Sequence, residues 1–408
     1  MEFIEWDDVL SFISDSTSAF RKRVRLYPAG GPGSKVFPPT YVIGESGGNY
    51  AMERRRFGEE VLNTVLLDSV QSQANRMEQA LLNAQRRGSL KIPLIQVNFN
   101  DRIPELNGTG LITTLDAPHR IADAIFRDSC IGEVKFRESE IGKDFAMATA
   151  RNATKMLKWC PHALIFGVWD STGAMGGLGN KFQRVITSEI IGVRAEKGVH
   201  TSSRIDPLGI TTVSDVFEDE SGEWTLDPDK AKKNKEGKPE KIAPSKVVHG
   251  NIPPTIEMDK NEPIRGGVTI DYALQTSVIS LPAIRKLHFP IDAKESLEVN
   301  NAGRALLAAL SLYGLTAMEG EGYDLRSGCL LIPDGKTGIE IISNDGNKVE
   351  KNIDLKTSTA IMDAAIENAK EAGLPWEDNI VTLQPSNKLV ELVRASRITR
   401  KKSQAEKE

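Results

Sequence analysis

The chain has 408 residues, of which 39% are hydrophobic and 6% are aromatic, and its formal net charge is −4. This length allows one large domain with insertions or two domains. The sequence has no run of about 18 apolar residues that could span a membrane, and its acidic start lacks the pattern of a signal peptide. The three cysteines lie far apart and fit neither a disulfide framework nor a zinc site. We therefore expect a cytoplasmic protein that carries no metal and no cofactor.

Positive charge is concentrated in two segments of this acidic chain. Residues 21–91 contain 12 lysines and arginines against 6 acidic residues, and residues 151–204 contain 8 against 3. Local basic surface of this kind is typical of a protein that binds a polyanion along one groove. An ordinary solvated surface is the alternative, and charge alone does not decide between them.

The first predicted strand has one cationic face. Arg21, Arg23 and Arg25 recur at every second position, which is the period of a β-strand. Such a ladder is unfavourable on a sheet unless water or an anion neutralises it. The loop that follows is rich in proline and glycine and ends at Lys35. These four cations are candidate contacts for a polyanion.

Residues 66–87 are predicted to form an amphipathic helix that Asp68 or Ser69 caps. Its apolar face consists of Val70, Ala74, Met77, Leu81 and Ala84. The neighbouring face is polar, contains little acid and suits a sugar-phosphate backbone. Its candidate contacts are Ser69, Ser72, Gln73 and Arg76. The alternative is a solvent-exposed face, for which more alternation of Glu and Lys is expected.

Residues 116–127 are predicted to begin another helix. His119 lies near Asp116 and Asp123 in the sequence, so a general base is conceivable. No second histidine or nucleophile accompanies it, which favours a structural histidine. We also include His119 and Arg120 among the candidate polyanion contacts.

A glycine loop at residues 173–181 follows an apolar run at 163–169 and precedes a helical pattern at 182–190. A strand, a glycine loop and a helix in this order present backbone N–H groups to a phosphate. A nucleotide loop of the NTPase type requires Gly-Lys-Ser/Thr, whereas Asn180 and Phe182 stand here. The sequence therefore favours a polyanion backbone over a bound nucleotide or a plain flexible turn. The candidate contacts are Gly176, Gly177, Gly179, Asn180, Lys181 and Arg184.

The second half of the chain mixes strand and helix patterns around a polar insert. Residues 218–262 are predicted to be an exposed, disordered insert whose lysines could still contact nucleic acid. Strands are predicted at 267–281, 329–332 and 338–342, and helices at 300–312 and 358–372. Strands mixed with helices and long insertions indicate an α+β fold.

Seven segments between about residue 20 and residue 395 carry a family resemblance. They are LYPAGGPGSKVFPPTY, LLDSVQSQANRMEQAL, LDAPHRIADAIFRDS, ALIFGVWDSTGAMGGLGNKFQRVITSEIIG, SRIDPL, VVHGNIPP and DLRSGCLLIP. Together they resemble the repeated backbone subunit of the CRISPR-associated RAMP superfamily in type I-G systems, formerly called type I-U. This is a subunit of a Cascade-type surveillance complex.

The resemblance implies an RRM-like (ferredoxin-like) palm with a helical fingers insertion and a thumb hairpin. It implies an N-terminal extension at residues 1–20 and a palm with insertions at 21–395. The fingers are expected at about 95–160, the thumb at about 205–265 and a basic tail at 396–408. In the family, a Ser-Gln helix start followed by a basic residue grips the guide RNA, and this pattern matches Ser72, Gln73 and Arg76.

Other positions follow from their order along the family's chain. The Phe-Gly strand end of the family matches Phe166-Gly167, and its following loop matches residues 171–181. Lys35 lies in a loop that faces the guide. Arg204 falls at the root of the expected thumb, and His249 falls within it.

The resemblance further implies a non-enzymatic protein that binds crRNA, polymerises head to tail along it and presents it to target DNA in antiviral defence. Its other partners would be the large subunit and the guide-processing subunit, and no membrane is expected. The alternative is a metal-dependent endoribonuclease acting on target RNA, with Asp206 or Asp215 in the thumb as the acid. RRM domains that read RNA on the open sheet use paired aromatic residues on central strands. The sequence shows no such pair, so we expect loops, helix ends and basic side chains to bind RNA.

Overall fold

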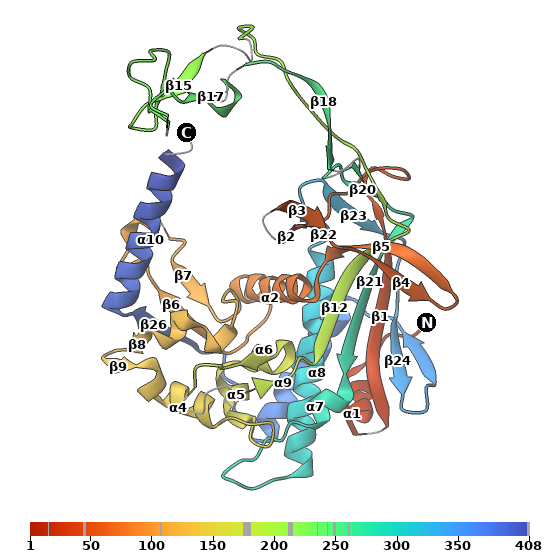
Figure 1. Cartoon of the computed structure of the whole chain (residues 1–408). Coiled ribbons are helices and arrows are strands. Elements are labelled where there is room, and N and C mark those ends of the chain that lie inside the picture. The colour runs from red at the N-terminus through yellow and green to blue at the C-terminus, as the bar shows by residue number, and fades with distance from the viewer. Residues whose placement is uncertain are drawn as a thin grey trace. The chain divides into compact units, whose positions relative to one another are not determined.

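The computed structural model describes residues 1–14, 16–43, 46–106, 108–173, 181–210, 215–234, 236–242, 244–247, 250–259, 262–263 and 265–405 (Figure 1). The chain forms two compact units. Unit 1 comprises residues 1–39, 51–195 and 270–390, and unit 2 comprises residues 40–50, 196–269 and 391–408. Unit 1 combines helices with mainly antiparallel strands, which confirms the α+β class.

The core of unit 1 is an antiparallel sheet, which has nine strands within the described ranges. The strand order is β22-β23-β1-β21-β12-β5-β4, and β24 pairs with both β1 and β25. The strands are β1 (Thr17–Pro28), β4 (Met52–Phe57), β5 (Glu60–Asp68), β12 (Ile186–Val193), β21 (Tyr272–Ser280), β22 (Tyr323–Arg326), β23 (Cys329–Pro333), β24 (Ile339–Ser343) and β25 (Lys348–Lys351). The predicted strands at 21–26, 267–281, 329–332 and 338–342 are thereby confirmed, with shifted ends.

Helices cover one face of this sheet (Figure 1). They are α1 (Trp6–Ser14), α2 (Val70–Arg86), α7 (Leu281–Arg285), α8 (Leu297–Gly320) and α9 (Leu355–Glu371). α8 contacts the other four, so its side chains are buried all round from Ala302 to Met318. Ser69 caps α2, as predicted, and α9 ends before Gly373, whose positive φ of 81° suits a helix stop.

A second, smaller sheet in unit 1 has the order β7-β6-β26-β8-β9. Its strands are β6 (Leu94–Asn98), β7 (Leu111–Thr113), β8 (Ser129–Ile131), β9 (Val134–Lys135) and β26 (Ile380–Pro385). Short helical segments lie between its strands and after β9: η1 (Pro104–Leu106), η2 (Arg120–Ala122), α3 (Ala124–Arg127), η3 (Phe136–Glu138), α4 (Glu140–Met147), α5 (Thr154–Trp159) and α6 (Pro161–Phe166). β10 (Val168–Trp169) then pairs with β11 (Lys181–Phe182).

Unit 2 consists of small antiparallel pairings with few buried apolar residues. They are formed by β2 (Thr40–Ile43) with β3 (Ser46–Tyr50), β13 (Glu196–Lys197) with β20 (Val268–Thr269), and β14 (His200–Arg204) with β18 (Ile252–Asp259) and β19 (Glu262–Pro263). β15 (Val216–Glu218) pairs with β16 (Trp224–Thr225) and β17 (Lys241–Ile242), and η5 (Pro244–Val247) follows. α10 (Asn387–Ala405) begins in unit 1 and is the basic helix near the C-terminal end of the sequence.

Four predicted elements are wrong. Residues 163–166 belong to a helix with proline at its first turn, and residues 186–193 form a central strand instead of a helix. The β-branched residues of that strand suit a buried sheet, which overrides their helical spacing. The predicted helix near 120–127 divides into two single turns, because Asp123 caps a new turn. The insert at 218–262, expected to be disordered, contains β16, β17 and β18 in its described parts.

No helix among the described residues combines the length and the apolar character that crossing a membrane requires.

Candidate nucleic-acid interface

The sheet face opposite the helices carries the arginine ladder of β1. Burial alternates along this strand: Lys22, Val24 and Leu26 are buried against the helices, whereas Arg23 and Arg25 are exposed. Arg21 lies on the same open face and is 27% exposed. The predicted strand with one cationic face is therefore confirmed, and whether it binds RNA remains a prediction.

The three arginines differ in their partners. Arg21 donates from Nε and Nη2 to both carboxylate oxygens of Glu340 on β24, at 2.5 and 3.0 Å. This hydrogen bond raises the pKa of Arg21 and lowers that of Glu340. The guanidinium of Arg25 lies 4.3 Å from the ring centroid of Tyr272 on β21. Arg23 and Arg25 form no ion pair with any described residue, so their charges are available to an anion.

Elsewhere on the open face, one arginine is paired with acidic residues of the sheet and one region is apolar. Arg55 on β4 donates to Glu189 on β12 and to Glu53, so its charge is paired within the sheet. Ile191, Val193 and Leu274 form a small buried cluster on the same face. Of the β1 and β4 arginines on this face, Arg23 and Arg25 are thus the two that form no ion pair with a described residue.

The polar stripe predicted on α2 lies on the covered side of the sheet. Its centre is Asp68, the last residue of β5, whose side chain is fully buried. Its carboxylate accepts from Ser72 Oγ at 2.7 Å, Gln73 Nε2 at 2.6 Å and Arg76 Nε at 2.9 Å. Arg326 of β22 adds a fourth bond at 3.3 Å. The stripe is a hydrogen-bonded network that joins α2 to the sheet.

Gln73 extends this network into the core. The residue is 1% exposed, and its Oε1 accepts from Ser188 of β12 at 2.8 Å and from Gln275 of β21 at 2.9 Å. Tyr323 of β22 donates to Gln275 in turn. A guide RNA cannot reach Gln73 while the helix is docked, so the structure corrects its predicted role. Arg76 also donates to the carbonyl oxygens of Asp324 and Leu325, which gives it a structural function.

Arg120 is buried and belongs to the core rather than to a binding surface. It is 7% exposed and forms two hydrogen bonds with Glu78 of α2, at 2.7 and 2.9 Å. Its Nη1 donates to the carbonyl of Gly167 at 2.8 Å. Burial raises the pKa of Glu78 to about 7, although Arg120 opposes the shift. The structure therefore corrects the predicted contact of Arg120 with a polyanion.

Two histidines close to Arg120 in sequence or space have opposite environments. His119 is exposed, and its backbone N–H donates to Asp123. His162 is fully buried, and burial lowers its pKa to about 3. Its Nε2 lies 3.2 Å from Sγ of Cys160, whose pKa burial raises to about 12. This pair is neutral at physiological pH and has no reactive thiolate.

The glycine loop connects two strands, so no helix begins at Lys181. The predicted positions Gly176, Gly177, Gly179 and Asn180 lie outside the described residues. Lys181 is exposed, and its Nζ lies 5.8 Å from the ring centroid of Trp169 on the paired strand β10. Arg184 is half-buried, and burial lowers its pKa. The sequence predicted an anion site at the N-terminus of a helix after the loop. The described residues there form the strands β11 and β12 instead, so they provide no helix N-terminus for an anion.

The remaining predicted contacts are distributed over both units. Lys35 is exposed in the loop after β1, and Arg204 ends β14 in unit 2. His249 lies outside the described residues. Asp206, the candidate nuclease acid, accepts a backbone N–H bond from Leu208 at 2.8 Å, as a turn residue does, and another from Gly250 at 2.9 Å. Within the described ranges, no three His, Cys, Asp or Glu side chains gather as metal ligands do.

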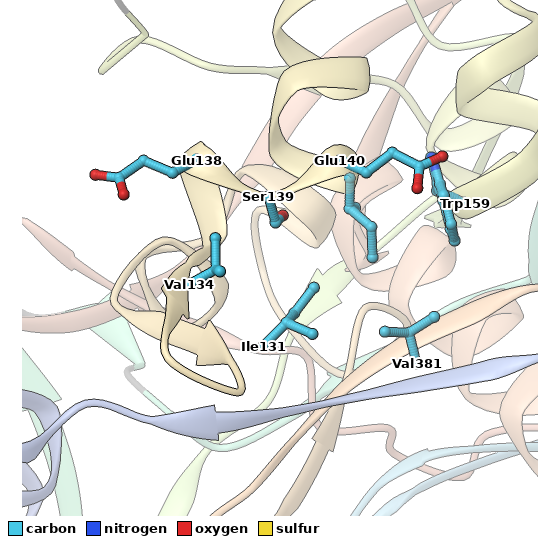
Figure 2. A pocket seen from close by; sticks show the side chains of 8 residues that line it. Ile131, Val134, Glu138, Ser139, Glu140, Trp159 and Val381 are labelled. Carbon is cyan, nitrogen blue, oxygen red and sulfur yellow. The ribbon is translucent and has the colours of Figure 1, made fainter.

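A cavity of about 470 Å³ lies in unit 1 beside the second sheet (Figure 2). Ile131, Val134, Ile141 and Val381 give it an apolar lining, and Glu138 and Glu140 flank Ser139 on its other side. Glu140 pairs with Lys158. An apolar cavity with carboxylates at its border does not suit a polyanion, because like charges repel.

Sequence reasoning missed the residues that organise both faces. The sequence suggests Asp68 only as a helix cap, although its spacing of four from Ser72 and eight from Arg76 would place all three on one side of the helix predicted at 66–87. Glu78 gave a weak signal as an acid within a buried helical face. Tyr272 and Glu340 gave no local signal, because they reach β1 only through strand pairing.

Comparison with known proteins shows what part of this chain is similar to. Residues 20–197 match the family model of the CRISPR-associated protein GSU0053. Over this range the chain is similar to a CRISPR-associated protein family, in agreement with the resemblance carried by its motifs. No curated protein matches the sequence significantly. The crystal structure of Csc2 from Thermofilum pendens aligns with a TM-score of 0.30 and 11% identity over 92% of this chain and 83% of that chain.

Proposed function

We propose that this chain is a crRNA-binding backbone subunit of a type I-G Cascade-type interference complex. The observation that carries the proposal is the ladder of arginines on the open face of the sheet, with Arg23 and Arg25 exposed and not ion-paired to described residues. A row of cations about 7 Å apart along a strand can follow a phosphate backbone. The family match over residues 20–197 adds the CRISPR context.

The topology of unit 1 supports an RRM-like palm. Four of its strands have the order β24-β1-β21-β12, and two helices, α2 and α8, follow the first and third of them along the chain. With β1, β12, β21 and β24 numbered one to four, the order is 4-1-3-2, that of a ferredoxin-like fold. The hairpin β4–β5 extends the sheet beyond β12. We infer that residues 196–269 of unit 2 act as the thumb and that the second sheet of unit 1 belongs to the fingers.

In this function the protein holds the guide and lets base pairing select the target. Its partners are the crRNA, target DNA by way of the guide, further copies head to tail and the other Cascade subunits, in the cytoplasm. The proposed role needs no catalysis and no cofactor. The turn bonds of Asp206 favour this role over an endoribonuclease that uses this carboxylate.

The test is to express the chain together with a CRISPR array and the guide-processing subunit, then to purify it and extract bound nucleic acid. We expect RNA of uniform length and assemblies whose size grows with the length of the guide. A preparation free of RNA, from cells that contain mature guide, would contradict the proposal. Incubation with matched target RNA and Mg²⁺ checks the alternative: cleavage abolished by Asp206→Ala would favour the nuclease.

A further inference from the structure

Two tyrosines lie on neighbouring strands at the end of the arginine ladder, although 245 positions separate them in the sequence. β1 and β21 pair antiparallel, with Arg25 opposite Leu274 and Leu26 opposite Ala273. The next residues along the two strands are Tyr27 and Tyr272. Both are partly exposed, and strand alternation places both on the open face. Strand pairing therefore brings two tyrosines to one end of the open face, which the sequence alone does not show.

Arg25 lies against one of these rings. Its guanidinium carbon is 4.3 Å from the centroid of Tyr272, a stacking distance, while the residue as a whole stays exposed. A guanidinium plane that rests on an aromatic ring is held in one orientation and presents its other side to solvent. Bases stack on such planes as well as on aromatic rings.

Charge next to the rings favours a nucleic acid over an apolar ligand. Arg23 is exposed one step along the same face, and it forms no ion pair within the described residues. Arg21 lies a further step away but is paired with Glu340. The unpaired positive charge of the ladder thus lies beside the aromatic pair. One nucleic-acid strand can place its phosphates against the arginines and its bases against the tyrosines at the same time.

We propose that Tyr27, Arg25 and Tyr272 form a base-stacking platform for single-stranded nucleic acid, with Arg23 binding the adjacent phosphate. The proposal rests on the proposed function, because it specifies how the guide strand is held on this face. The platform reads no sequence, since every base offers a flat face. It excludes a continuous duplex, because bases inside a duplex are already stacked on each other.

The test uses the complete chain, freed of nucleic acid at high salt, and three labelled probes of about 12 nucleotides. They are a single-stranded RNA, a ribose-phosphate strand of equal length and charge that lacks bases, and an RNA duplex. Fluorescence anisotropy gives each Kd over a range of salt. We expect the single strand to bind at least about tenfold more tightly than the abasic strand, the scale of one stacked base. Equal affinity for the single-stranded RNA and the abasic strand would overturn the platform. This comparison uses the unmutated chain, so it does not depend on whether a variant folds.

Variants then locate the effect. Tyr27→Leu should reduce the preference for bases and leave the salt slope unchanged, whereas Tyr27→Phe should keep the preference because the ring remains. Arg23→Gln should instead lower the salt slope by about 0.7, one phosphate contact on a single strand. Circular dichroism and the unfolding midpoint of each variant show that the fold is intact. A base preference that survives Tyr27→Leu and Tyr272→Leu in folded protein would place the stacking site elsewhere and overturn the proposal.

Failure of the platform is distinguishable from failure of the proposed function. If the chain co-purifies with guide RNA but binds abasic strands equally well, the function stands and the platform is wrong. If it binds neither probe and carries no RNA from cells, the proposed function itself is wrong. If Tyr27→Leu changes assembly of the chain and leaves RNA binding intact, the face is a protein interface, which also overturns the platform.

Discussion

The two faces of the central sheet both carry positive charge, but they use it differently. On the covered face, Lys22 is 5% exposed and pairs with Glu319 of α8 at 2.6 Å, and Asp68 holds Arg76 and Arg326. On the open face, one residue away along β1, Arg23 is exposed and has no described ion-pair partner. Desolvation explains the difference, because a buried charge must be paired, whereas a solvated one need not be.

This contrast separates polar residues that hold unit 1 together from those available to a ligand. Sequence periodicity predicted both the α2 stripe and the β1 ladder as polyanion contacts. Their partners show that the stripe is saturated by protein groups. Mutations on the covered face should therefore affect stability first, and mutations on the open face should affect binding first.

The largest expected effect is that of Asp68→Ala. Removal of this buried carboxylate leaves Gln73 Nε2 without its acceptor and Arg76 and Arg326 without their counter-charge. We expect a loss of about 3 kcal/mol in the free energy of unfolding, measured by urea denaturation. The matched control is Glu340→Ala on the open face, where the pair with Arg21 is about one quarter exposed and should be worth less than about 1 kcal/mol. Equal losses would remove the distinction between the faces.

The second effect is a pH dependence that arises from Glu78. Because burial raises its pKa to about 7, above its ordinary value of 4.5, the folded chain binds a proton between these values that the unfolded chain releases. The contribution of Glu78 to stability is therefore fully present below pH 4.5 and is lost as the pH rises through 7. We expect the difference in unfolding free energy between the native chain and Glu78→Gln to change over this range. A constant difference from pH 4.5 to pH 7.5 would mean that Arg120 keeps Glu78 ionised throughout.

A smaller loss is expected for Gln73→Ala. The substitution removes one bond to Asp68 and leaves the hydroxyl of Ser188 and the amide of Gln275 with fewer partners. The expected destabilisation is about 1–3 kcal/mol by thermal or chemical unfolding. Binding of RNA by the folded fraction should not change, because the side chain does not reach the surface. Weaker RNA binding at unchanged stability would restore Gln73 as a guide contact.

Local patterns predicted the parts of the fold that depend on neighbours in sequence. The alternation along β1, the capped helix at Ser69 and the helix stop at Gly373 were all readable because each signal lies within one element. The strand at 186–193 was misread, because its helical spacing of apolar residues competed with a central place in the sheet that no local pattern reveals.

The candidate site was only partly predictable for the same reason. The arginines of β1 formed a local ladder, whereas Tyr272 and Glu340 join them from strands more than 240 residues away. The roles of Gln73 and Arg120 were misassigned because burial, which decides whether a polar group can meet a ligand, depends on how the helices dock. A polar stripe on a helix does not show which of its sides faces the protein.

The last prediction concerns binding without a change in stability. The double variant Arg23→Gln and Arg25→Gln removes two exposed charges of the ladder, and we expect its RNA affinity to fall about tenfold at moderate salt. The slope of log K against log salt should decrease in magnitude by about 0.7, because Arg23 supplies one phosphate contact and Arg25 stacks on Tyr272. The unfolding free energy should change by less than about 1 kcal/mol, since only the contact of Arg25 with Tyr272 is lost.

The matched control is Arg54→Gln with Arg56→Gln on β4, which removes the same charge from exposed arginines of the same sheet. Strand alternation places them on the opposite side from Arg55, whose guanidinium meets Glu189 on the open face. If the control weakens binding as much as the ladder variant does, RNA responds only to the net charge of the chain. If only the ladder variant weakens binding, the position of the charge matters, and the open face is the surface that contacts the guide.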